Sequence, residues 1–530
     1  MNRLDPYKTS IEGLGLNQET LAYQADLLDI ALRQQKGPTF PVLDTCRLGN
    51  GGILPEFLPA TAPGEPWAKG YAAFTLAAGA ASRYSQPLFA LSEALAQADR
   101  SGAVAALAAL AKEGASSWPL PTQFTTLVEQ PARLEELGSV DLMGLGEHLQ
   151  LPKALMPCVR DGVSFLAMKH LENAKLPGLT GQVFITPPGM QKAFTRHLEE
   201  ELGRSHLLAA PLPTAYLEQG PALSTIRFER SGRPFREPTG EVSPVPAGHG
   251  ALAQLFPAAL TFFPGTDALF IRNIDNIMGT TAEVLAATER FLCLHRRILT
   301  TVQTIRTGLA RSDLSLAGSA AAALLVTLGL DRQQHEAAPE PLELPNGPEG
   351  ALWRLQIMLF HCDLEGARTP ERLLALYARP VNLLGQVPNI HHDVGGTPCF
   401  IAMPKSDATG HPGGSKRGKV CLEVVHASPD DQRAKLADHD KATHFNPGFC
   451  AVEITADPLH YSKRNHHFWL MAEKVYRGQQ VVYYETALYE LIGHSDFANT
   501  AFVEVPRRVF NPHKTLRDAL NRTLASWLPA

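Results

Sequence analysis

The chain has 530 residues, a formal net charge of -5 and 45% hydrophobic residues. That length suits two or three domains, or one large core with additions, and the apolar content is typical of a globular protein. Acidic and basic residues nearly balance and no basic run is present, which argues against polynucleotide binding. We therefore expect no nucleic acid partner, although a mononucleotide would need only a few well-placed cations.

The 7 cysteines are scattered along the chain, and no two of them form a C-x-x-C pair. This odd, scattered set argues against a disulfide framework and against a structural zinc site, so we expect reduced thiols. The segment Met1–Ser10 is polar and lacks the apolar region of a secretory signal. The most apolar segment, 317–330, is too short to span a bilayer. We expect a cytoplasmic protein without a membrane partner.

The first predicted domain, 1–70, is an N-terminal helical extension with a helix over 19–34. From 71 to 280, predicted strands alternate with predicted helices, which is the pattern of a mostly parallel, doubly wound sheet. We interpret this stretch as a nucleotide-binding α/β core. Its strands are predicted at 71–76, 182–186, 224–229 and 268–274, and its helices at 86–113 (two helices), 163–175, 189–203 and from Ala251 onward.

Residues 281–378 carry a helical pattern and are predicted to form an all-α insertion. The chain then returns to strands, and we interpret 379–530 as the C-terminal part of the core. Its strands are predicted at 381–387, 398–403, 419–426, 449–455 and 501–505. The predicted fold class is therefore α/β, with a Rossmann-like mixed sheet, an all-α insertion and a β-rich C-terminal part.

An apolar run at 268–274 leads directly into Asp275. This is the pattern of a buried strand that delivers a carboxylate to the edge of a sheet, where ligands of open α/β sheets bind. An Asp in that place is a candidate ligand for a Mg²⁺ ion that also binds substrate phosphates. The alternative is a helix N-cap, because a helix could start at Asn276.

Two segments of small residues are candidates for close contact with a nucleotide. Ala77–Ser82 follows the first predicted strand, where backbone N–H groups can wrap phosphates and Arg83 can add a positive charge. The alternative is a tight turn with a surface arginine. Gly248-His249-Gly250 lets the backbone come close to a flat ligand, because glycine has no Cβ atom.

Three polar side chains are further candidates for nucleotide or phosphate contact. Lys153 follows Pro152 and can project one cation toward a triphosphate, or it is a solvated lysine. Gln219 can read the edge of a base or a sugar hydroxyl, although most glutamines do neither. Lys514 lies just beyond a predicted strand and is either a second phosphate cation or a lysine at a helix start.

Two side chains of the C-terminal part are candidates for contact with a ligand. Glu423 lies inside an apolar run, so it needs a partner, which is either a sugar hydroxyl or a buried arginine. Asn446 lies at a turn, either as a ligand contact or as an Asx-turn.

Other catalytic patterns are absent from the chain. It contains no H-E-x-x-H, no G-x-S-x-G and no G-x-x-x-x-G-K-[ST] segment. The histidine groups at 391–393 and 466–467 have no third ligand at regular spacing, which argues against a transition-metal site.

In this order the motifs resemble those of the UDP-sugar pyrophosphorylases, in particular the UDP-N-acetylhexosamine pyrophosphorylase type. The A-x-G-A-A-S-R turn, L-P-K, G-H-G-A-L, N-I-D-N and T-H-F-N-P segments resemble the bacterial domain of unknown function 4301 family still more closely. The resemblance covers about 71–280 and 379–520. It implies a nucleotidyltransferase fold of glycosyltransferase-A type.

The resemblance also implies roles for the matching residues. The metal ligand would be Asp275, which would hold Mg²⁺, and the catalytic cations would be Arg83, Lys153 and Lys514. The acceptor would be bound by Asn273, Glu423 and Asn446. The nucleotide would be bound by Ala77, Ala78, Gly79, Ala80, Gln219, Gly248, His249 and Gly250.

The implied reaction joins a nucleoside triphosphate, with UTP as the first choice, to a sugar 1-phosphate and releases pyrophosphate. One alternative is a cytidylyltransferase that acts on a non-sugar phosphate or phosphonate. Another is a nucleotide-sugar sensor or scaffold without turnover, because Ala78 and Ala81 stand where glycines are usual in the phosphate loop.

Overall fold

The computed structural model of this chain divides it into two compact units. Unit 1 comprises 1–72, 219–271 and 289–507, and unit 2 comprises 73–218, 272–288 and 508–530. The residues described are 14–16, 21–22, 42–56, 69–79, 90–91, 94–95, 99–112, 127–136, 152–204, 212–331, 344–361, 369–390, 395–406, 412–423, 442–455, 469–476, 479–515, 518–519 and 522–528.

An 8-stranded mixed sheet is the largest sheet among the described residues. Its strand order is β12-β9-β13-β8-β2-β3-β4, and β16 also pairs with β9. The β3–β4 and β9–β16 pairs are parallel, whereas β12 and β13 pair with β9 in the antiparallel sense. The strands are β2 (Tyr71–Leu76), β3 (Leu179–Thr186), β4 (Thr214–Glu218), β8 (Ala268–Asn273), β9 (Val381–Pro388), β12 (His444–Phe445), β13 (Phe449–Glu453) and β16 (Asn499–Glu504).

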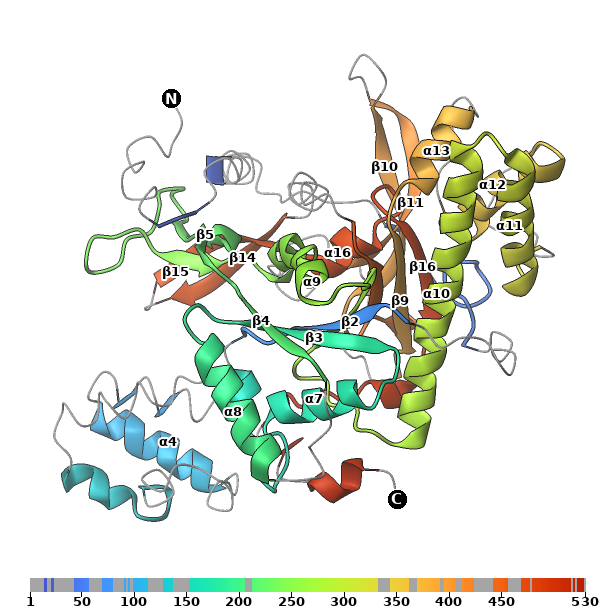
Figure 1. The fold of residues 1–530 in the computed structure, drawn as a ribbon. Coiled ribbons are helices and arrows are strands. Elements are labelled where there is room, and N and C mark those ends of the chain that lie inside the picture. Colours follow the sequence, from blue (N-terminus) through green and yellow to red (C-terminus); the bar gives the residue numbers. More distant parts are fainter. Residues whose placement is uncertain are drawn as a thin grey trace. The chain divides into compact units, whose positions relative to one another are not determined.

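In unit 2, helices α7 (Phe165–Ala174) and α8 (Gln191–Arg204) pack against β3 and β4 (Figure 1). The Ser164 side chain caps α7 by accepting a hydrogen bond from the Ala167 N–H. Nearly every residue of β3 is buried, as expected for a parallel strand covered on its faces. The unit also contains α4 (Arg100–Lys112), η3 (Pro131–Glu136), η4 (Lys153–Leu155) and η9 (Leu524–Trp527).

Four helices are described within the stretch predicted to be an all-α insertion. They are α10 (Ala282–Ala310), α11 (Leu314–Thr327), α12 (Gly347–Met358) and α13 (Pro370–Tyr377). Asp313 and Thr369 cap α11 and α13 by accepting backbone N–H groups. Trp353 and Tyr377 are fully buried. Apart from 281–288, which belong to unit 2, this stretch belongs to unit 1.

Three smaller sheets complete the β structure of unit 1 that is described. They are β1-β10-β11, β14-β15-β6 and β5-β7. The bounds are β1 (Val42–Thr45), β5 (Ser224–Ile226), β6 (Phe228–Glu229), β7 (Pro244–Pro246), β10 (Thr397–Ser406), β11 (Pro412–Leu422), β14 (Trp469–Tyr476) and β15 (Gln479–Thr486).

Some elements differ from those predicted. The single strand predicted at 224–229 is two short strands that belong to different sheets. The helix predicted from Ala251 is the 3-10 helix η6 (His249–Leu255) followed by the short α9 (Ala258–Phe262). The β14–β15 hairpin was not predicted.

The remaining short helices are η5 (Pro221–Leu223), α16 (Leu488–Gly493) and η8 (Arg507–Val509).

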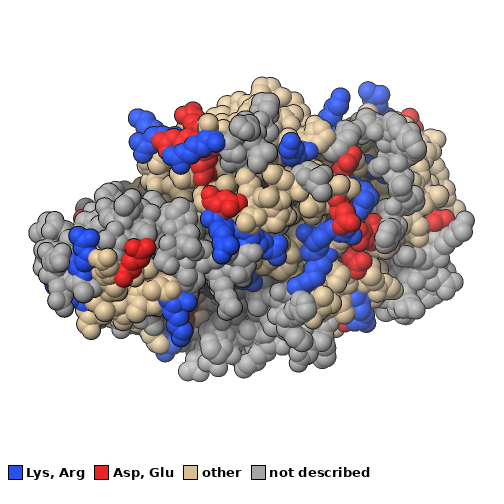
Figure 2. Space-filling model, turned by 90° about the horizontal axis from the view of Figure 1, so that it is seen from below, with Lys and Arg blue, Asp and Glu red and all other residues tan. Residues whose placement is uncertain are grey.

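Lysine and arginine side chains stand beside aspartate and glutamate side chains on the described part of the face in Figure 2. No helix of the described chain is long and apolar enough to cross a membrane. Several predictions lie outside the described residues: Ala80, Arg83, the histidine groups at 391–393 and 466–467, and most of the helix at 19–34.

Candidate functional site

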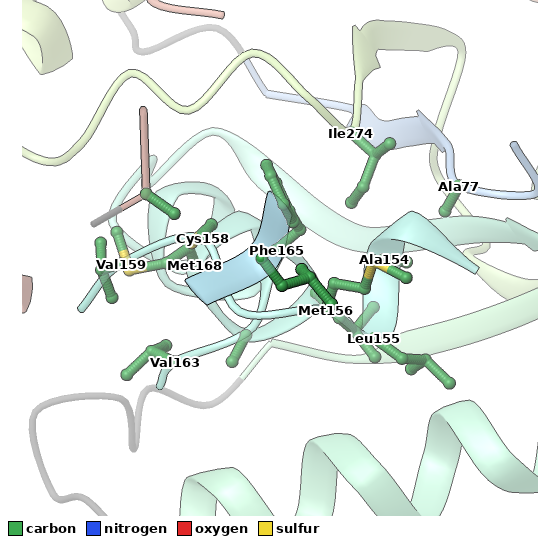
Figure 3. Close-up of a cluster of buried hydrophobic side chains, with 14 of the residues drawn as sticks. Ala77, Ala154, Leu155, Met156, Cys158, Val159, Val163, Phe165, Met168 and Ile274 are labelled. Atoms are coloured by element: carbon green, nitrogen blue, oxygen red, sulfur yellow. The ribbon is translucent and has the colours of Figure 1, made fainter. Parts of the chain in front are cut away.

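The loops that follow β2 and β8 rest on one buried apolar cluster of unit 2. Ala77 comes directly after β2 and Ile274 directly after β8, and both are buried members of this cluster. In Figure 3 they lie on the side of the cluster where Ala154 also lies. Gly79, two residues after Ala77, is exposed, and Asp275, directly after Ile274, is half-buried.

Lys153 joins three segments of unit 2 that are far apart in sequence. Its backbone N–H donates to the Gly79 carbonyl at 3.2 Å, and its Nζ donates to the His513 carbonyl at 2.7 Å. The same Nζ lies 3.7 Å from Asp275 Oδ2. Lys153 itself is only 9% exposed. Burial lowers the pKa of its ammonium group from the ordinary value, and the Asp275 carboxylate acts in the opposite direction.

Hydrogen bonds hold the turn that carries Asp275 against the C-terminal segment of unit 2. The His513 N–H donates to the Asp275 carbonyl at 2.9 Å. Asn276 donates from Nδ2 to the Val509 carbonyl at 2.9 Å and accepts the Asn511 N–H at 2.8 Å. Helix α10 starts only at Ala282. Asp275 is therefore not the N-cap of α10, and its side chain, 35% exposed, is accessible to a ligand.

The predicted lysine at the C-terminal end lies next to this group. Lys514 is exposed and follows His513, whose carbonyl accepts the Lys153 ammonium. The backbone N–H groups of Lys514 and Thr515 donate to Asp518 Oδ2 at 2.9 and 2.8 Å. Burial, followed by the Arg522 charge, lowers the pKa of His513 to about 4, so its ring is neutral at physiological pH. His513 was not singled out from the sequence, where one isolated histidine carries no signal.

The Gly-His-Gly segment of unit 1 lies against the backbone of Thr486. The Thr486 N–H donates to the Ala247 carbonyl at 2.7 Å. Gly248 has a φ of +80°, and a Cβ atom at Gly250 would lie 2.8 Å from the Thr486 carbonyl carbon. The close approach that these glycines permit is thus to the protein's own chain. His249, between them, is exposed at the start of η6.

Asn446, a predicted acceptor contact in unit 1, forms an Asx-turn. Its Oδ1 accepts the Gly448 N–H at 2.8 Å, and its Nδ2 donates to the Gly385 carbonyl at 2.8 Å. The residue is 1% exposed. Of the two alternatives open from the sequence, the Asx-turn is the one that the structure contains.

Glu423, the other predicted acceptor contact in unit 1, has a backbone partner rather than a buried arginine. Its Oε1 accepts the Tyr489 N–H at 2.5 Å, and its own N–H donates to Glu490 Oε1 at 3.1 Å. Burial raises the pKa of Glu423 to about 8, and the charges of Glu490 and Glu485 act in the same direction. The carboxyl group is therefore largely protonated at neutral pH.

The candidate residues thus fall into two groups. In unit 2, Lys153 is bonded to the Gly79 and His513 carbonyls and lies beside Asp275, and Asn273 is the last residue of β8. Ala77, Ala78 and Lys514 also belong to unit 2. Unit 1 contains half-buried Gln219 directly after β4, Gly248, His249, Gly250, Glu423 and Asn446.

No family model and no curated protein matches the chain, so the resemblance to the domain of unknown function 4301 family stays a prediction. Among solved structures, one similar fold is UDP-glucose pyrophosphorylase from Leishmania major, a point variant in complex with UDP-glucose. Its identity is 12% and its TM-score 0.44, with 91% of this chain and 69% of that chain covered. A second is from Entamoeba histolytica and is assigned as a UDP-N-acetylglucosamine pyrophosphorylase. Its identity is 8% and its TM-score 0.39, with 89% of this chain and 82% of that chain covered.

Proposed function

We propose that this chain is a nucleotidyltransferase that makes a nucleotide sugar and pyrophosphate from a nucleoside triphosphate and a sugar 1-phosphate. The observation that carries the proposal is the convergence in unit 2 of the Gly79 carbonyl, Lys153, Asp275 and the His513 carbonyl. Phosphate transfer is supported by groups of these kinds, namely a loop after the first core strand, a cation, and a carboxylate at a strand end.

The reaction needs little covalent help from the protein. An oxygen of the sugar 1-phosphate attacks the α-phosphorus, and the bond from that phosphorus to the oxygen bridging to the β-phosphorus breaks. The electron pair leaves with pyrophosphate, and the attacking phosphate oxygen carries no proton that must be removed. The protein therefore contributes by placing the two substrates in line and by neutralising charge.

We assign the phosphates to unit 2. Lys153 would lie beside the triphosphate as a point charge, and Arg83 would add a second cation. Exposed Lys514 would bind the phosphate of the acceptor. The backbone at Ala77–Gly79 would approach the nucleotide, since Gly79 is exposed and carries no side chain.

Mg²⁺ is part of the proposal, and the residues around Asp275 suit an ion held mainly by phosphates. The described part of the chain contains no group of three or more His, Cys, Asp or Glu side chains that could hold a metal. Mg²⁺ typically binds through one or two carboxylates together with substrate phosphates and waters. The single accessible carboxylate of Asp275 fits this mode. When bound, Mg²⁺ would neutralise charge on the phosphate oxygens.

The contacts with the base and with the acceptor are proposed residue by residue. His249 is exposed between two glycines and is the candidate for contact with the base, together with half-buried Gln219. Glu423 is the stronger acceptor candidate, because a largely protonated carboxyl group can both donate to and accept from a sugar hydroxyl. Asn446 would support the acceptor through its turn, since both of its amide atoms already have partners.

The test is pyrophosphate release with Mg²⁺, across the four nucleoside triphosphates and a panel of sugar 1-phosphates and non-sugar phosphates. We expect release that depends on both substrates, which would identify the base and the acceptor together. Strong preference for CTP with a non-sugar phosphate would favour a cytidylyltransferase instead. No release, with UTP or a UDP-sugar still raising the melting temperature, would favour a sensor. No nucleotide binding at all would overturn the proposal.

A further inference from the structure

A buried cluster of charges lies beneath the turn that carries Asp275. Glu172 and Lys169 on α7 and Arg272 on β8 are each at most 1% exposed. Lys169 Nζ lies 3.1 Å from Glu172 Oε2, and Arg272 donates to the same carboxylate oxygen. These residues could not be predicted as partners, because nothing in the sequence shows that α7 and β8 meet.

Glu172 binds the backbone of the turn directly. Its Oε1 accepts the N–H of Met278 at 2.6 Å and the N–H of Gly279 at 2.7 Å. Gly279 has a φ of +76°, a conformation that favours glycine. Lys169 holds the other end of the turn, since its Nζ donates to the Asn276 carbonyl. The residue before Asn276 is Asp275.

The charges explain why this carboxylate stays ionised in the core. Burial alone would raise the pKa of Glu172, but the Arg272 and Lys169 charges and the backbone N–H bond reverse that and lower it. Two cations surround one carboxylate, so a positive charge remains in the cluster. Burial and the Arg272 charge lower the pKa of Lys169 to about 8, whereas Glu172 and Asp275 favour its protonated form.

Unit 2 contains a second buried carboxylate that also accepts a backbone N–H group but lies elsewhere in the unit. Glu201, on α8, is 8% exposed and accepts the Ser164 N–H at 3.0 Å and the Ser164 hydroxyl at 2.5 Å. It therefore supports the start of α7 and, within the described part of the chain, does not bond to the turn at 276–279. Glu201 provides a matched control for Glu172.

We propose that Glu172 is a positioning residue that places the Asp275 carboxylate for a divalent cation by holding the backbone of the 276–279 turn, with Lys169 as its second anchor. This inference rests on the proposed function in so far as Asp275 is the metal ligand. Partners behind a metal ligand typically change metal affinity by roughly 10–100-fold when they are removed.

The test compares Glu172→Gln with Glu201→Gln in the full chain, with two measurements. Hydrogen–deuterium exchange reports on the amides of 276–279, and Mn²⁺ titration followed by electron paramagnetic resonance, with UTP present, reports on the metal site. We expect faster exchange at 276–279 and roughly 10-fold or more weaker Mn²⁺ binding in Glu172→Gln only. Because Glu172→Gln leaves two buried cations without a carboxylate, Lys169→Met is a second variant. It keeps the charge-balanced Glu172–Arg272 pair, and we expect smaller changes in the same direction.

The outcomes separate this inference from the proposed function. Suppose that the wild-type protein binds Mn²⁺ and that the Glu172→Gln and Glu201→Gln variants show the same exchange and the same Mn²⁺ affinity. This result would overturn the inference and leave the proposed function standing. Failure of the wild-type protein to bind Mn²⁺ would contradict both. If Glu172→Gln does not fold, Lys169→Met decides, and unchanged exchange and Mn²⁺ affinity in that variant would overturn the inference.

Discussion

Asp275 and Asp161 are both acidic residues of unit 2 that reach solvent, but their surroundings differ. Asp161 is exposed and its carboxylate accepts the Leu524 N–H at 2.6 Å. Asp275 has the ammonium group of Lys153 at 3.7 Å and follows a buried strand. The same side chain thus serves as a local support in one place and as a candidate metal ligand in the other.

Asp275→Asn removes the negative charge while keeping the shape of the side chain. If Asp275 holds the metal, we expect kcat to fall by roughly 10²-fold or more, because charge neutralisation on the phosphates is lost. The melting temperature should change little, since the carboxylate is partly exposed. Pyrophosphate release and thermal unfolding measure the two effects. Asp161→Asn is the control and should retain activity. Full activity in Asp275→Asn would refute the metal assignment.

Glu423 allows a prediction about pH. Its pKa in the folded chain is about 8, above the ordinary value of 4.5. Between these two values the folded state holds a proton that the unfolded state has released, so the free energy of unfolding decreases as pH rises from 4.5 to 8. The glutamine of Glu423→Gln cannot titrate, so the free energy of unfolding of this variant should decrease less over the same pH range. Urea unfolding at pH 5 and at pH 8 tests it, and equal pH dependence in both proteins would contradict the pKa.

At the scale of elements, the start of η6 depends on a contact with a distant strand. Thr486, the last residue of β15, bonds to the Ala247 carbonyl through both its N–H and its hydroxyl group. Gly250 lies so close to the Thr486 backbone that no side chain fits between them. The glycines of this segment therefore have a packing role in addition to any contact with a nucleotide.

Gly250→Ala would place a Cβ atom 2.8 Å from the Thr486 carbonyl carbon, and backbone cannot move aside cheaply. We expect the variant to lower the free energy of unfolding by about 1–3 kcal/mol, as other overpacked sites do. Urea denaturation measures the change. Gly220→Ala is the matched control in unit 1, because a Cβ atom there meets nothing within 4 Å. If the two variants are equally stable, the Gly-His-Gly segment does not pack closely against Thr486.

At the scale of the whole molecule, the described cysteines behave as core residues. Six of them are free, and five of those six are buried, the exception being half-buried Cys293. Burial raises the pKa of the Cys399 thiol to about 12 and raises the pKa values of Cys158, Cys421 and Cys450 as well. Buried, protonated thiols react slowly with alkylating reagents.

Brief treatment of the native protein with iodoacetamide should therefore modify Cys293 and spare the other five described cysteines, and unfolding should expose all 7 cysteines. Peptide mass spectrometry distinguishes the positions. Dithiothreitol should leave the melting temperature unchanged, since the described cysteines form no disulfide. Rapid native modification of Cys421 or Cys450 would contradict the packing of unit 1.

The sequence by itself determined the strands whose apolar runs are long and uninterrupted. The predicted 71–76 is β2, and 268–274 and 381–387 each match their strand to within one residue. The order of the motifs also predicted that the loop after β2, Lys153 and Asp275 serve one site. These signals are local, because a buried strand and the polar residue after it are adjacent in the chain.

Only the tertiary structure decided which distant groups become partners. Glu172 and the backbone of Met278 and Gly279 are more than 100 positions apart, and Lys153 and His513 are 360 apart. The β14–β15 hairpin was missed, and 224–229 divides between two sheets because its two halves pair with different strands. Side-chain partners depend on which distant segments the fold brings together. The local hydrophobic periodicity of the sequence carries no information about such long-range contacts.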